Sequence, residues 1–201
     1  MRKHFIFDLG NVMVDFDLNL IYRRVSELSG RTVVTDFHLQ DSDQVFAVET
    51  GKISDQDYLD GLCKTIGVEL TMEQLIGLWQ EAFTLNPAGL VLFEELKNQG
   101  HPVHFLSNLA WHNMEAIRRN WPDFFNQSVE NFFSYELGFH KPDERIYCAA
   151  LKHLNVEPSD CFFMDDKPEN VEAGRDLGMN ACCFSAKNLS AIREAVRKFT
   201  D

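Results

Sequence analysis

The N-terminal segment reads Phe5-Ile6-Phe7-Asp8-Leu9-Gly10-Asn11-Val12, and it is the most informative stretch of the chain. An apolar run of strand-forming residues ends there in a carboxylate, and a glycine turn follows. The segment 103–106 repeats this pattern before Ser107-Asn108. The segment 161–164 repeats it before Asp165-Asp166. Each of these segments predicts a buried strand with polar residues at its C-terminal end.

Helix and strand signals alternate through the second half of the chain. Further strands are expected at residues 103–106, 131–135, 161–164 and 181–184. Helices are expected at 87–100, near 111–120, behind Pro142, from Pro168 until shortly before Gly178, and at the C-terminus. Alternation of this kind predicts an α/β fold with a mostly parallel sheet.

A long helical segment separates the first strand from these alternating units. Residues that are good N-caps start three helices in it, at Asp17, Ser54 and Thr71. Its roughly 70 residues are too many for a simple crossover. We therefore expect a helical cap over residues 16–86, inserted into a core formed by 1–15 and 87–201. Asp15 and Asp17 are expected to frame the entry to this cap.

The charge balance of the chain limits its partners. Nineteen Lys and Arg stand against thirty-one Asp and Glu, which gives a formal net charge of −12 at pH 7. Such a charge repels nucleic acid and anionic lipid, so neither is an expected partner. No apolar run approaches membrane-spanning length, and no signal-peptide core follows the N-terminus. The five cysteines are odd in number and form no CxxC pair, which favours reduced thiols and a cytoplasmic protein.

Parallel strands bring their carboxyl ends to one edge of a sheet, where open α/β proteins bind their ligands. We expect the polar residues that end the three buried segments to meet there. Carboxylates, a hydroxyl and an amide together suit a hard cation such as Mg²⁺ and a phosphate group. Because the net charge repels anions, the counter-charge for a phosphate must come from a metal, a lysine or helix N-termini.

The chain resembles the haloacid dehalogenase superfamily over its whole length. The four motifs of that family are matched by Phe7-Asp8-Leu9-Gly10-Asn11-Val12, by Leu106-Ser107-Asn108, by Lys141-Pro142, and by Phe163-Met164-Asp165-Asp166 with Asn170. Their order and their placement at strand ends make the combination more specific than any one of them. The resemblance implies a Rossmann-like three-layer core with a mostly parallel sheet and an inserted α-helical cap.

A finer resemblance is to the bacterial α-D-glucose-1-phosphate phosphatase group and to the phosphatase domain of soluble epoxide hydrolases. It rests on Gly10-Asn11-Val12 and on Glu49-Thr50-Gly51-Lys52-Ile53-Ser54. It implies a Mg²⁺-dependent phosphatase that hydrolyses a small phosphomonoester, such as a hexose 1-phosphate, through an aspartyl-phosphate. The expected partner is thus a small phosphorylated metabolite. The sequence indicates neither which one it is nor the oligomeric state.

The resemblance also assigns roles to the motif residues. Asp8 is the expected nucleophile. Mg²⁺ is expected between Asp8, the backbone carbonyl of Gly10 and Asp166. Asp165 or Asn170 would orient these metal ligands without binding the metal itself. Without a metal, the carboxylate and a phosphate dianion would repel each other.

Three residues are expected to contact the phosphate. Ser107 offers a hydroxyl, and Asn108 with its neighbours offers backbone N–H groups near a helix start. Lys141 offers a compact positive charge to both nucleophile and phosphate. The expected catalytic residues are Asp8, Ser107 and Lys141. His112 and His140 flank the site in sequence, and both are interpreted as ordinary polar residues because neither has a partner at ligand spacing.

One position departs from the family pattern. Family phosphatases usually carry a second Asp two residues after the nucleophile, and this chain has Gly10 there. The metal-binding carbonyl survives that change, but the general acid/base, worth about 10²–10⁴-fold in rate, is lost. A phosphonatase or dehalogenase-type hydrolase, or a catalytically weak regulatory protein that binds phosphate and metal, is therefore an alternative. Dehalogenases need no metal, so the Asp165-Asp166 pair argues against that branch.

Overall fold

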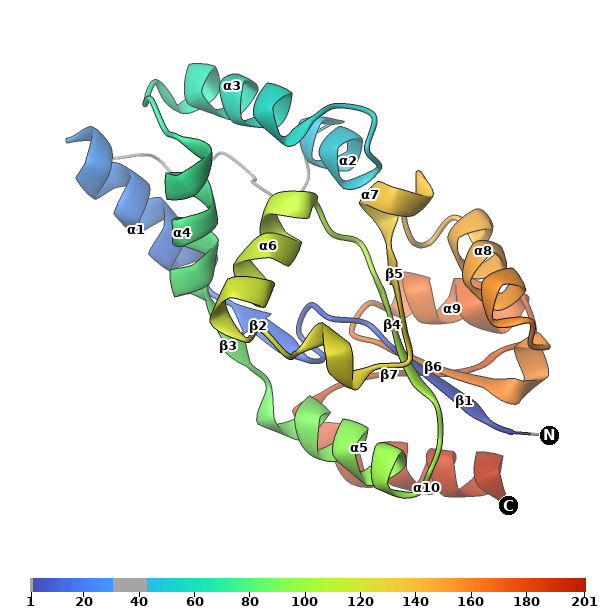
Figure 1. Ribbon diagram of the computed structural model, residues 1–201. Helices are drawn as coiled ribbons and strands as arrows, with labels where there is room; N and C mark the ends of the chain where they lie inside the picture. The colour runs from blue at the N-terminus through green and yellow to red at the C-terminus, as the bar shows by residue number, and fades with distance from the viewer. Residues whose placement is uncertain (1, 31–42) are drawn as a thin grey trace.

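The computed structural model describes residues 2–30 and 43–201. Part of the expected cap, residues 31–42, lies outside the described residues. The main sheet has five strands in the order β5-β4-β1-β6-β7, and every neighbouring pair in it is parallel. Its strands are β1 (His4–Phe7), β4 (Val103–Ser107), β5 (Glu130–Phe133), β6 (Cys161–Asp165) and β7 (Asn180–Cys183). The predicted α/β fold with a mostly parallel sheet is confirmed (Figure 1).

Helices connect these strands at the places where the sequence predicts them. They are α5 (Pro87–Asn98), α6 (Trp111–Asn120), α8 (Glu144–Leu154), α9 (Pro168–Asp176) and α10 (Leu189–Thr200). The short α7 (Ser134–Leu137) was not predicted, and it begins inside the strand expected at 131–135. Three 3-10 helices lie at Phe125–Gln127, Pro158–Asp160 and Ala186–Asn188. Asn86 starts α5 because its side chain accepts the N–H groups of Ala88 and Gly89. Gly100, with φ of 83°, follows the end of the same helix.

The side chains of β1 alternate between two faces of the sheet. Phe5 and Phe7 are fully buried in a core cluster that also contains Phe93 of α5. Ile6 belongs to a second cluster, which contains Tyr147 of α8. One short apolar run therefore fills two cores, because successive strand residues point to opposite faces. In Figure 1, α5 and α10 lie on one side of the sheet, and α8 and α9 lie on the other.

Four helices are described between the first strand and α5. They are α1 (Leu18–Ser29), α2 (Asp43–Glu49), α3 (Asp55–Ile66) and α4 (Met72–Ala82). The three predicted N-caps are confirmed. Asp17 accepts the N–H groups of Asn19 and Leu20, and Ser54 and Thr71 each form a capping box with the residue three positions on. No helix in the described ranges is long and apolar enough to cross a membrane.

A two-stranded sheet joins the ends of this helical segment. It pairs β2 (Val14–Phe16) with β3 (Phe83–Leu85) in antiparallel register, so that Phe16 faces Phe83. Each strand has three residues, which are too few for a periodic pattern to be recognised, so this sheet was not predicted from the sequence. Asp15, in the middle of β2, accepts a hydrogen bond from Asn86 Nδ2 at 2.9 Å. It therefore ties the segment to the start of α5.

A buried histidine lies in β4. The side chain of His104 is almost fully buried, and its Nε2 is 3.1 Å from His4 Nδ1. Burial, with a smaller contribution from His4, lowers the pKa of His104 to about 4. In the unfolded chain a histidine takes up its proton near pH 6.5. The folded state therefore binds fewer protons between these two pH values than the unfolded state does.

Stability should consequently fall as the pH drops from about 6.5 to about 4, by about 3 kcal/mol in total from this residue. Replacing His104 with Phe, a ring of similar size that cannot titrate, should remove this part of the pH dependence. Urea unfolding of wild type and His104→Phe at pH 7 and pH 4.5 measures it. His153→Phe, at a side chain that is 59% exposed, is the matched control. The same loss in wild type and His104→Phe would contradict the prediction.

Candidate active site

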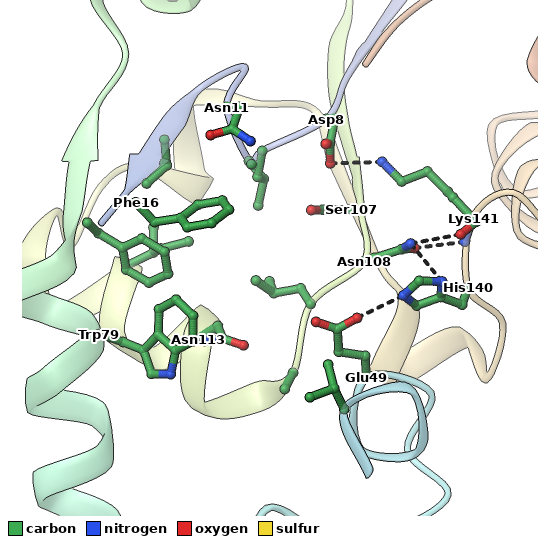
Figure 2. A pocket seen from close by; sticks show the side chains of 18 of the residues that line it. Asp8, Asn11, Phe16, Glu49, Trp79, Ser107, Asn108, Asn113, His140 and Lys141 are labelled. Carbon is green, nitrogen blue, oxygen red and sulfur yellow. Dashed lines mark hydrogen bonds and ion pairs between the residues drawn. The ribbon is translucent and has the colours of Figure 1, made fainter. Parts of the chain in front are cut away.

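The polar residues at the ends of β1, β4 and β6 meet at one edge of the sheet. Figure 2 shows Asp8 and Ser107, from the ends of β1 and β4. Asp8 directly follows β1, and its N–H donates to Met164 O at 2.8 Å, which continues the pairing with β6. Carboxylate oxygens of Asp8, Asp165 and Asp166 lie within 4.8 Å of one another. The three strand ends therefore converge as the parallel topology requires.

Lys141 is the cation of this cluster. Its side chain is almost fully buried, and Nζ lies 2.8 Å from Asp8 Oδ1 and 2.5 Å from Asp165 Oδ2. Nζ also donates to Leu106 O at 2.9 Å. Burial alone would lower the pKa of Lys141, but the two carboxylates outweigh it and raise that pKa. The lysine is therefore charged, and it faces the carboxylate that the sequence analysis named as nucleophile.

The positive charge near Asp8 does not compensate for the burial of its carboxylate. Burial raises its pKa to about 6; Lys141 opposes this shift, and Asp165 adds to it. Three carboxylates gather here, and Lys141 contacts two of them. A second cation at this edge would stabilise the charged form of Asp8.

Asp165 and Asp166 differ in what their oxygens contact. Asp165 is fully buried and accepts hydrogen bonds from Lys141 Nζ, from Asn170 Nδ2 at 3.0 and 3.1 Å, and from the N–H of Lys167 at 2.9 Å. Asp166 lines the cavity in front of Asp8, and its Oδ2 accepts a hydrogen bond from Asn11 Nδ2 at 2.9 Å. Asp166 is thus placed to meet a ligand, and Asp165 is placed to hold Lys141 and Asn170.

Gly10 also lines this cavity. Its φ is not in the left-handed region; the positive φ in this turn, 54°, belongs to Asn11. A Cβ built on Gly10 would lie 3.5 Å from Phe16 Cε1, an ordinary contact distance. Neither the backbone conformation nor the available space therefore requires glycine at this position.

The side chains of Asn108 and Ser107 differ in what they contact. Asn108 Oδ1 accepts a hydrogen bond from the N–H of Lys141 at 2.8 Å, and its Nδ2 donates to the C=O of Lys141 at 2.9 Å. Nδ2 also lies 2.9 Å from His140 Nδ1. The next N–H, that of Leu109, is already donated to Ser134 Oγ. The side chain of Asn108 and the N–H of Leu109 are therefore engaged within the protein, and a phosphate contact through the N–H of Asn108 stays a prediction. Ser107 Oγ is drawn toward the open space of the cavity (Figure 2).

Two histidines that the sequence analysis interpreted as ordinary polar residues join the helical segment to the core. His140 Nε2 lies 2.8 Å from Glu49 Oε2, and His112 Nδ1 lies 2.6 Å from Asp55 Oδ1. Asp55 also accepts the backbone N–H of His112 at 2.9 Å. Both histidines line the cavity. The partners stand 91 and 57 positions apart in the sequence, so no local spacing could reveal them.

The family of haloacid dehalogenase-like hydrolases matches residues 2–178. The chain belongs to this family. The D-ribitol-5-phosphate phosphatase of Bacteroides thetaiotaomicron is 28% identical over 185 residues, which cover 89% of each chain. A sesquiterpene phosphatase of Aspergillus oryzae is 28% identical over 186 residues, which cover 88% of this chain and 87% of the relative.

Solved structures of the family share the fold. A haloacid dehalogenase family enzyme of Bacteroides thetaiotaomicron, in complex with magnesium and inorganic phosphate, has a TM-score of 0.80 at 22% identity and covers 92% of this chain and 96% of its own. A predicted haloacid dehalogenase-like family hydrolase of Porphyromonas gingivalis has a TM-score of 0.81 at 21% identity and covers 98% of each chain. The resemblance and the Rossmann-like core are thereby confirmed, whereas the finer resemblance to glucose-1-phosphate phosphatases stays a prediction.

Proposed function

We propose that the chain is a Mg²⁺-dependent phosphatase that hydrolyses a small phosphomonoester through an aspartyl-phosphate. The observation that carries this proposal is the contact of buried Lys141 with Asp8, at 2.8 Å, beside a cavity that Asp166 also lines. Membership of a hydrolase family supports the hydrolysis. The names of the two phosphatase relatives support a phosphoric monoester as the substrate.

The donor set beside Asp8 fits Mg²⁺. Asp8, the Gly10 carbonyl and Asp166 offer only oxygen atoms, which this hard cation prefers. The excess of carboxylates over lysine favours a further cation at the same place. The neighbour that holds magnesium and inorganic phosphate supports this pair of ligands. When bound, the ion would offset the repulsion between Asp8 and a phosphate dianion.

Each residue of the site has its own role in the proposed reaction. The Asp8 carboxylate attacks phosphorus, the bond to the leaving oxygen breaks, and an aspartyl-phosphate forms. Water then cleaves this intermediate, which releases phosphate and restores Asp8. Lys141 stabilises the negative charge of nucleophile and phosphate, and Asp165 keeps the lysine in place. Ser107 donates its hydroxyl to a phosphate oxygen.

The leaving oxygen receives no proton from position 10. Asp15, the acid that the sequence places near the cap entry, is bonded to Asn86 and is not among the residues that line the cavity. A leaving group that is stable as an anion would therefore react fastest. An anomeric phosphate, such as the hexose 1-phosphate expected from the sequence, meets this demand on the leaving group, although the apolar residues that line the cavity do not favour the hydroxyl groups of a hexose.

Residues 16–86 act as a cap in this proposal. Val48, Tyr58 and Trp79 from this segment line the cavity opposite the strand ends. The contacts of Glu49 with His140 and of Asp55 with His112 hold the segment against the core. A segment placed in this way covers the substrate and excludes water from the site. The core boundaries 1–15 and 87–201 belong to the same proposal.

The metal proposal predicts a specific defect in Asp166→Ala. Loss of one of two carboxylate ligands should raise the Mg²⁺ concentration for half-maximal activity by at least about tenfold to a hundredfold, while the fold is kept. Mg²⁺ titrations of p-nitrophenyl phosphate hydrolysis, with circular dichroism as the test of folding, measure this. Asp176→Ala, at an exposed carboxylate at the end of α9, is the control.

An Asp166→Ala enzyme with the wild-type Mg²⁺ response would exclude Asp166 as a ligand. Wild type that binds Mg²⁺ and phosphate, yet hydrolyses no ester, would favour the alternative of a regulatory binding protein.

A further inference from the structure

We infer that the substrate is the phosphate ester of a mainly apolar alcohol rather than of a polyol. This inference rests on the phosphatase activity proposed above. It starts from the walls of the cavity in front of Asp8, which has a volume of about 240 Å³.

The cavity has one polar and one aromatic side (Figure 2). Asp8, Ser107 and Lys141 stand on the first side, where the phosphate would bind. Phe16 and Trp79 stand across the open space. Trp79 stacks on Phe83 with ring centroids 5.2 Å apart and meets the edge of Phe16 at 6.4 Å. The β2–β3 pair places Phe16 and Phe83 opposite each other, so the aromatic wall is fixed by backbone pairing.

Aliphatic side chains also line the cavity. Val48 from α2, Leu109 after β4 and Ile117 from α6 line the cavity and are almost fully buried. A hydroxyl group placed against such a wall loses its water without gaining a partner, which is unfavourable. A methylene or ring placed there is favoured, because apolar surface leaves water.

Several polar groups around the cavity are already engaged. Both ring nitrogens of His140 contact other residues, Asn108 and Glu49. His112 donates its Nδ1 proton to Asp55, and its ring stacks on Tyr58 at 5.3 Å. His140 therefore cannot replace the water around a polyol without breaking its own contacts, and His112 has only Nε2 to offer.

Asn113 differs from these residues. It is only 7% exposed, it lines the cavity beside Trp79, and its Nδ2 has no hydrogen-bond partner among the described residues (Figure 2). An amide buried in this way is unfavourable unless a ligand atom satisfies it. The substrate inferred here therefore has an apolar body and one polar group at the end away from the phosphate.

The first experiment compares pentyl phosphate with ribitol 5-phosphate in the wild-type enzyme with Mg²⁺. The two share a five-carbon chain and a primary leaving oxygen, and the hydroxyls of ribitol make it the better leaving group. We nevertheless expect kcat/KM to be at least about tenfold higher for pentyl phosphate. From ethyl to hexyl phosphate, kcat/KM should rise about threefold to fourfold per methylene until the cavity is filled. Equal values, or a preference for ribitol 5-phosphate, would overturn the inference.

Variants locate the effect in the cavity. Trp79→Ala should lower kcat/KM for hexyl phosphate about 10- to 100-fold, mainly through KM, with little change for methyl phosphate. Trp121→Ala removes a tryptophan that does not line the cavity and is the control. Asn113→Leu, which keeps the size of the side chain, should leave pentyl phosphate unaffected and lower 5-hydroxypentyl phosphate about tenfold. A uniform effect of Asn113→Leu on both esters would contradict the assigned role of its amide.

Failure of the phosphatase proposal would be visible separately. In that case no ester, p-nitrophenyl phosphate included, is hydrolysed with Mg²⁺. The cavity is then tested by calorimetry, in which pentylphosphonate should bind at least about tenfold more tightly than inorganic phosphate. Equal affinities would overturn the inference on the apolar body.

Discussion

Asp8→Asn should lower kcat by at least about 10³-fold, because the amide keeps the size of the side chain but cannot form the aspartyl-phosphate. Asp8 faces Lys141 at 2.8 Å and is buried, so the variant keeps its surroundings while one negative charge is removed. Hydrolysis of p-nitrophenyl phosphate under single-turnover conditions measures the loss. Asp15→Asn is the matched control, since this carboxylate lies on β2 and does not line the cavity.

Inhibition by phosphoryl analogues is a second test of Asp8 as the nucleophile. Beryllium fluoride with Mg²⁺ should inhibit wild type by occupying the phosphoryl position on Asp8, and should lose this effect in Asp8→Asn. An Asp8→Asn enzyme that keeps more than a few per cent of the rate would indicate direct attack by water on phosphorus. The covalent mechanism proposed here would then be wrong.

Gly10→Asp should act in the opposite direction and raise the rate for poor leaving groups. A carboxylic acid at this position could protonate the departing oxygen, and such a group is worth about 10²–10⁴-fold. The turn accepts a side chain: φ at Gly10 is not positive, and an added Cβ meets Phe16 Cε1 at 3.5 Å. We expect the gain to be largest for alkyl phosphates and small for p-nitrophenyl phosphate, whose leaving group needs no proton.

The measurement is kcat/KM for aryl phosphates of graded leaving-group pKa in wild type, Gly10→Asp and Gly10→Asn. The asparagine variant adds the same bulk without an acid. Wild type should show a steep dependence on leaving-group pKa, and Gly10→Asp a flatter one. A flat wild-type series, with chemistry shown to be rate-limiting, would mean that another residue supplies the proton, and Glu49 of the helical segment would be the next candidate.

Much of the fold could be predicted because local rules and packing agree. The strands that begin at His4, Val103 and Cys161 are buried apolar runs, so length and composition alone identify them. Asp17, Ser54 and Thr71 start helices through side-chain bonds to residues two or three positions away, which a sequence displays directly. By contrast, β2 and β3 form only because the helical segment between them brings their backbones together.

The convergence of the candidate site residues was predictable to a similar extent. The topology of the sheet brings Asp8, Ser107 and Asp166 to one edge, and this follows from strand order alone. The roles of Asn108 and the two histidines did not follow, because each depends on a contact made across the fold. Asn108 holds the backbone of Lys141, and His140 meets Glu49 of the helical segment. The apolar wall was missed for the same reason, since aromatic residues in a sequence are most simply interpreted as core packing.

Because β2 pairs with β3, the helical segment between these two strands can be replaced as a unit by another segment. Its two ends leave the core as neighbouring strands, so a segment of another length can be inserted there without altering the register of the main sheet. The residues proposed for phosphoryl chemistry, Asp8, Lys141 and Asp166, all lie outside it. Grafting the corresponding segment of a polyol phosphatase between residues 16 and 83 should therefore change the share of substrate preference that Val48 and Trp79 supply, while Leu109, Asn113 and Ile117 and the reaction itself stay in place.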